Sequence, residues 1–189
     1  NSDYNIWLGA ESGPQMSTNI ATQTGGHNVA IGFYAMKSIT TGANNVCIGK
    51  EAGKLITSGG GNVIIGLNAG DAVLGGTCNT LVGYLAGTGM TGGTYNTCLG
   101  YNTGNQTTDG IQNVYIGMEG GYYKNNTGCI FIGSFSGAKS NDGNHTNKLA
   151  IGAVQNADTY RGYNGAFLWG DFNSTALTSR YLRINGHLG

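Results

Sequence analysis

The amino-acid sequence predicts an all-β fold, a parallel β-roll or solenoid built from coils of 17 residues. Two observations lead to this prediction. Glycine makes up 36 of the 189 residues while proline occurs once, and the glycines recur at a fixed interval. Because glycine adopts positive φ angles without steric cost, periodic glycines indicate a turn that is repeated along the chain.

The repeat is carried by the pattern Asn-x-x-(Ile/Leu/Val)-Gly. Six consecutive copies lie 17 residues apart, and looser copies occur at residues 5–9, 129–133 and 148–152. Atypical units at the ends are typical of stacked repeats. We interpret the conserved-looking positions as structural; they are Asn28, Asn45, Asn62, Asn79, Asn96 and Asn113, followed by Gly32, Gly49, Gly66, Gly83, Gly100 and Gly117.

Each unit is expected to contain two short strands separated by glycine turns. In one unit, residues 45–48 form a run rich in β-branched residues, and a second, weaker strand is expected around Ile56. A helix is a poor alternative, because each interior glycine costs about 1 kcal/mol. About eight coils stacked ~4.8 Å apart would give a rod roughly 40 Å long.

The first strand is apolar on both of its faces. Side chains alternate along a strand, so Val46 and Ile48 face one way and Asn45 and Cys47 the other. We expect the Ile48 positions of successive coils to form the core of the roll, and a partner chain to cover the Cys47 positions, since a coil this narrow cannot cover both faces. The predicted subunit interface comprises Cys47, Ile64, Leu81, Cys98, Tyr115 and Phe131.

These motifs resemble a known family. The Asn-Val-Ala-Ile-Gly motif at residues 28–32, the Ala-Gly pair after it and the Thr/Ser-Gly-x-x-Asn turn resemble the head repeats of YadA-type trimeric adhesins. The longer period, with Ile-Gly-x-x-Ala-Gly, is still more similar to those repeats in bacteriophage tail fibres. The resemblance implies a left-handed roll packed as a homotrimer around an axis. It assigns no catalytic or binding residue.

The C-terminal part adds a second resemblance. The segments 166–172 and 182–186 look like the sequence that closes such heads in phage tail fibres, which favours a phage fibre over a bacterial adhesin. We therefore divide the chain into β-roll head repeats at residues 1–152 and a closing segment at residues 153–189 that leads to a neck.

Composition argues against several classes of function. Charged residues make up 10% of the chain and the net charge is zero, whereas a nucleic-acid binder needs a basic surface to neutralise phosphates. No apolar run approaches the ~20 residues of a membrane-spanning helix, so we expect no membrane insertion.

The sequence offers no pattern for catalysis, a metal or a cofactor. Its nine carboxylates and three histidines are scattered, and no Gly-x-Ser-x-Gly motif occurs. Residues 87–92 match the dinucleotide pattern Gly-x-Gly-x-x-Gly, but these glycines belong to the repeat. We expect neither an enzyme nor a bound cofactor, and cysteines that remain reduced.

Candidate receptor-binding residues lie where the repeat is interrupted, because deviations from a repeat often map to loops on the binding face. Simple loop variation explains each interruption equally well. The candidates are Tyr122, Tyr123, Lys124, Asn125, Asn126, Tyr160 and Tyr163.

The leading expectation is a receptor-binding tip of a phage tail fibre that attaches to a glycan or protein of the host cell surface. Its location would then be the virion, after assembly in the host cytoplasm. The alternatives are the head of a bacterial trimeric autotransporter adhesin and, more remotely, a polysaccharide depolymerase with sites between chains.

Overall fold

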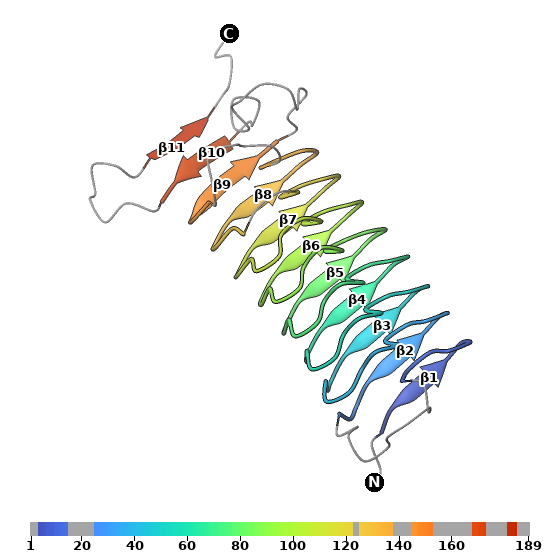
Figure 1. Cartoon of the computed structure of the whole chain (residues 1–189). Helices are drawn as coiled ribbons and strands as arrows, with labels where there is room; N and C mark the ends of the chain where they lie inside the picture. The colour runs from blue at the N-terminus through green and yellow to red at the C-terminus, as the bar shows by residue number, and fades with distance from the viewer. Residues whose placement is uncertain are drawn as a thin grey trace.

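The computed structural model describes residues 4–14, 25–122, 125–137, 145–152, 168–172 and 181–184. Within these ranges the chain forms one 11-stranded sheet in which the strands follow one another in chain order (Figure 1). The strands are β1 (Ile6–Leu8), β2 (Val29–Ile31), β3 (Val46–Ile48), β4 (Val63–Ile65), β5 (Thr80–Val82), β6 (Thr97–Leu99), β7 (Val114–Ile116), β8 (Ile130–Ile132), β9 (Lys148–Ile151), β10 (Leu168–Asp171) and β11 (Tyr181–Ile184).

The first nine strands are parallel, and each pairs with the next in strict register. Ala30 lies beside Cys47, and Cys47 lies beside Ile64, so one turn of the chain takes 17 residues. The predicted parallel β-solenoid with 17-residue coils is confirmed; it makes about seven turns, and the described residues contain no helix. The C-terminal strands continue the same sheet, but β10 and β11 are antiparallel to their neighbours.

The core lies behind the middle residue of each strand. These middle residues are fully buried within a single chain and are Ala30, Cys47, Ile64, Leu81, Cys98, Tyr115, Phe131 and Ala150. They pack with two further buried rows, exemplified by Ala52 and Ile56. The strand residues on either side of them, such as Val46 and Ile48, are half-exposed on the opposite face of the sheet.

Two predictions about the strand faces were therefore wrong. The proposed interface residues Cys47, Ile64, Leu81, Cys98, Tyr115 and Phe131 have no exposed surface with which to contact a partner. The row that contains Ile48, predicted to be the core, faces outward. The reason is the asparagine that shares a strand face with Cys47: its amide needs hydrogen-bond partners that only the interior supplies.

That asparagine forms a continuous ladder through the interior. The Asn45 Oδ1 accepts hydrogen bonds from the Asn62 backbone N–H and from its Nδ2, each at 3.0 Å. The same Nδ2 donates to the Gly76 carbonyl at 2.9 Å. Equivalent bonds link Asn28 through Asn113, and all six side chains are buried.

The second strand expected around Ile56 does not form. Glu51 and Gly53 adopt positive φ angles of 58° and 57°, which breaks the extended conformation before Ile56 is reached. The Ile56 N–H donates locally to the Gly53 carbonyl at 3.1 Å, while the Leu55 N–H donates to Asp71 of the next coil at 2.9 Å. This part of each coil is thus a series of turns hydrogen-bonded to its neighbour.

The glycine that follows each strand is required by close contact between coils. Gly49 has a φ of 134°, and a Cβ built on it would lie 2.5 Å from the carbonyl oxygen of Gly66 in the next coil. Any larger residue would push adjacent coils apart, which explains why this position is glycine in every copy.

Candidate assembly and receptor-binding surfaces

The outer face of the sheet is an apolar strip. We define the outer face as the first and third residues of strands β2–β8 together with their counterparts in β1 and β9. Along β3 and β4 these residues are Val46, Ile48, Val63 and Ile65, all at least partly exposed. Nine parallel strands spaced ~4.8 Å apart make a strip about 38 Å long. Only Thr80 and Thr97, in neighbouring strands, interrupt its aliphatic character between β2 and β8.

A second exposed row lies one residue beyond the glycine that ends each strand. We call it the corner row; it consists of Phe33, Lys50, Leu67, Tyr84, Tyr101 and Met118. Tyr84 and Tyr101 are 46% and 45% exposed, and their ring centroids lie 5.6 Å apart at an interplanar angle of 50°. Two tyrosine rings therefore stand side by side on successive coils, open to solvent.

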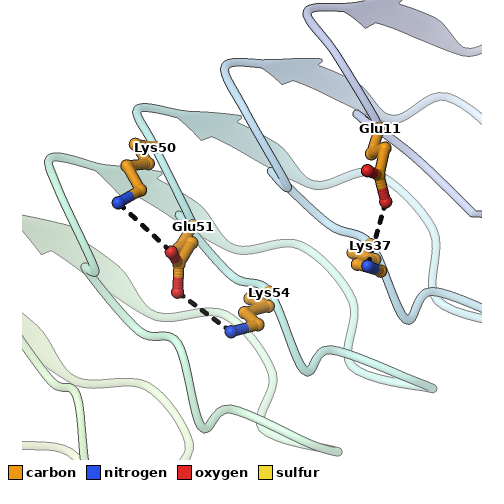
Figure 2. A network of polar contacts seen from close by, with 5 residues as sticks. All are labelled: Glu11, Lys37, Lys50, Glu51 and Lys54. Atoms are coloured by element: carbon orange, nitrogen blue, oxygen red, sulfur yellow. Dashed lines mark hydrogen bonds and ion pairs between the residues drawn. The ribbon is translucent and has the colours of Figure 1, made fainter.

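Charged residues gather on the N-terminal coils (Figure 2). Glu11 pairs with Lys37 at 3.0 Å, and Glu51 pairs with Lys54 at 2.9 Å and with Lys50 at 3.5 Å. The hydrogen bond from Lys54 lowers the pKa of the Glu51 carboxyl, and the bond to Glu11 raises the pKa of the Lys37 amine. Pairs as exposed as these stabilise a fold only slightly.

Lys37 is further held by an aromatic contact. Its Nζ lies 3.6 Å from the centroid of the Tyr34 ring, and the Tyr34 ring stacks on that of Phe33 with centroids 3.9 Å apart. A cation already engaged by both a carboxylate and a ring face is poorly disposed to bind a ligand.

The described receptor-binding candidates do not form a site. Asn126 is fully buried: its Nδ2 donates to the Tyr115 hydroxyl at 2.9 Å and its Oδ1 accepts from the His145 N–H at 3.0 Å. Asn126 was therefore a wrong prediction, because it extends the polar interior and cannot reach a receptor.

Asn125 and Tyr122 take part in bonds between coils. The Asn125 Oδ1 accepts from the Thr108 hydroxyl and from the Asp109 N–H, each at 2.8 Å. The half-buried Tyr122 accepts a bond from Gln106 at 3.3 Å. The remaining candidates, Tyr123, Lys124, Tyr160 and Tyr163, lie outside the described residues.

Sequence reasoning missed the tyrosine pair, although its signal was present. Tyr84 and Tyr101 are 17 residues apart, so they occupy the same position in successive coils. Attention to interruptions of the repeat draws the search away from residues that obey it.

The cysteines show two environments. All four thiols are free; Cys47, Cys98 and Cys129 are buried, whereas Cys78 is exposed. Burial raises the pKa of the Cys98 thiol to about 12, so this thiol is not a nucleophile at neutral pH.

Over the described ranges, no three or more His, Cys, Asp or Glu side chains gather closely enough to hold a metal ion. The same residues include no helix of the length and apolarity that would cross a membrane. Comparison of the chain with protein-family models, curated proteins and solved structures found no match.

Proposed function

We propose that this chain is one third of a homotrimeric, non-enzymatic attachment tip of a phage tail fibre, and that it binds a component of the host cell surface. In this proposal the roll is left-handed and three rolls surround a common axis, as in the family that the repeat resembles. The protein would be carried on the virion after assembly in the host cytoplasm.

The observation that carries the proposal is the outer face. A row of half-exposed valines and isoleucines runs along one side of the sheet from β2 to β8. Exposed apolar strips of this extent are unusual on monomers and are typical of surfaces covered by a partner. A cyclic arrangement of identical copies covers such a strip on every chain and leaves none exposed.

The interior supports a scaffold role. Its asparagines spend their donors and acceptors on one another and on glycine carbonyls, and the hydroxyls of Thr107 and Ser136 donate to carbonyls at 3.1 Å. Polar groups that are buried and mutually bonded fix the register of the coils and leave their hydrogen-bonding capacity unavailable to a substrate.

The test is binding of the purified, fluorescently labelled protein to a panel of bacterial strains, measured by flow cytometry. We expect it to label a subset of strains, and we expect no loss of polymer length when isolated surface polysaccharide is incubated with it. Periodate and protease treatment of the cells would distinguish a glycan from a protein receptor. A folded protein that labels no strain would argue against attachment, and shortening of the polymer would favour a depolymerase.

A further inference from the structure

The middle of the solenoid differs from its ends in charge. No Asp, Glu, Lys, Arg or His occurs between Asp71 and Asp109, a stretch that includes β5 and β6. The N-terminal coils carry the Glu11, Lys37 and Glu51 ion pairs. The molecule therefore has a neutral central zone, and the exposed tyrosine pair of the corner row lies within it.

Both tyrosines of the pair have unused binding capacity. Nearly half of each side chain is exposed, and the two rings are inclined to each other at 50°. Within the described part of the chain, the ring contact is the only side-chain interaction of either residue, and no group there bonds to their hydroxyls. An interface alone would be served better by aliphatic residues, because burying an unpaired hydroxyl is unfavourable.

This combination suits a sugar without charge. An aromatic face contacts the C–H groups of a pyranose while a phenol hydroxyl exchanges hydrogen bonds with the sugar hydroxyls. An acidic sugar would find no cation in the neutral zone to pair with its carboxylate. Instead it would meet Glu119, whose N–H donates to the Tyr101 carbonyl at 2.9 Å and whose coil therefore adjoins that of Tyr101.

We propose that Tyr84 and Tyr101 form a binding site for a neutral glycan. The inference rests on the proposed attachment function and specifies both the chemistry of the receptor and the residues that contact it. One such site would bind weakly, and repetition of the site on each copy of the chain would raise the overall affinity by avidity.

The experiment is binding of the labelled protein to a printed array of neutral and acidic glycans. The variants are Tyr84→Ala and Tyr101→Ala. The matched control is Leu67→Ala, which truncates a residue of the same row that is 44% exposed. Circular dichroism and sizing chromatography establish that each variant keeps the fold and the subunit mass of the parent protein.

We expect signal on neutral glycans, a loss of at least tenfold in both tyrosine variants, and no comparable loss in Leu67→Ala. Tyr101→Phe should lose less than Tyr101→Ala, because it keeps the ring face. Binding only to acidic glycans, binding to none, or equal binding by the tyrosine variants would overturn the inference. Cell labelling that survives in both tyrosine variants would overturn this site while leaving the attachment function intact, whereas absence of any cell labelling would refute attachment itself.

Discussion

At the scale of single residues, the polar interior determines which way each strand faces. The ladder asparagines make three hydrogen bonds each with the coil before them and with a glycine carbonyl, as Asn62 does with Asn45 and Gly76. These bonds are made away from water, so the loss of any one partner leaves others unsatisfied. The ladder therefore holds both the register of the coils and the inward orientation of the neighbouring core residue.

Replacing one ladder asparagine should destabilise the fold strongly. In Asn62→Ala, the Asn79 backbone N–H loses the acceptor that it contacts at 3.0 Å, and the Gly76 carbonyl loses its donor. We expect the free energy of unfolding to fall by about 3 kcal/mol or more, measured by urea denaturation at a fixed protein concentration. The control is Gln106→Ala, which removes an exposed amide and should cost less than about 1 kcal/mol. Equal effects of the two substitutions would contradict a stabilising ladder.

Cysteine reactivity should report the same division between inside and outside. Cys47 and Cys98 lie in the core, and burial raises the pKa of both thiols. In the native protein we expect a thiol reagent such as DTNB to modify Cys78 alone and to reach the other three cysteines only after denaturation. Rapid modification of native Cys78→Ser would show that the core is open.

At the scale of the coil, neighbouring positions compensate for one another in volume. The first full coil has the small Ala30 in its strand, and the buried Met36 stands where later coils have glycine. Where the strand residue is the large Tyr115, the corresponding position is Gly121, and the ring of Phe131 stacks beside it with centroids 5.6 Å apart. The core is thus filled by different combinations of residues in different coils.

This compensation makes some glycines irreplaceable and others not. Gly121 has a φ of 60°, and a Cβ on it would lie 2.5 Å from the Tyr115 ring. Gly121→Ala should therefore lower the free energy of unfolding by about 2–4 kcal/mol, combining overpacking with left-handed backbone strain. At Gly75 the nearest atom to a new Cβ is the Ser58 Oγ at 3.5 Å, so Gly75→Ala should change stability by less than about 1 kcal/mol. Paired urea titrations decide this, and a similar loss in both variants would contradict it.

The coil is also the scale at which sequence reasoning worked and then failed. The 17-residue spacing of Asn45, Asn62 and their counterparts was enough to predict a parallel solenoid, because stacked coils require equal lengths. Strand alternation alone could not tell which face was inside, since Cys47 and Ile48 both belong to apolar rows. The missing physical argument was that an invariant asparagine needs buried partners, which carries Cys47 inward with it.

The candidate site was less predictable than the fold. Asn126 looked like a loop residue because the repeat shortens there, yet its amide bonds to the buried Tyr115 hydroxyl. A shorter coil leaves space that a large core residue fills, and this long-range exchange of volume leaves no local pattern in the sequence. The corner-row tyrosines could have been found from their 17-residue spacing, but their exposure and their 5.6 Å separation required the structure.

At the scale of the whole molecule, the outer face is the feature that a single chain does not explain. Its valines and isoleucines lie on a sheet about 38 Å long and repeat at every strand. Strands with both faces apolar are usually covered on both, and here the chain's own turns cover only the side that holds Cys47 and Ile64. Self-association along the outer face is the arrangement that covers every copy equally.

Light scattering on a sizing column should therefore give a mass near three times the 19.5 kDa of one chain. Ile65→Glu places a charge on the outer face and should shift the mass toward that of one chain without changing the circular dichroism spectrum, since Ile65 is not part of the buried core. Leu74→Glu is the matched control: Leu74 is 45% exposed but lies outside the strands, so its mass should stay near that of the parent. A parent protein that is monomeric would refute the trimer, and dissociation by Leu74→Glu to the same extent would place the interface elsewhere. If only Ile65→Glu dissociates the protein, then the same row of residues that gives each strand its second apolar face also joins the chains.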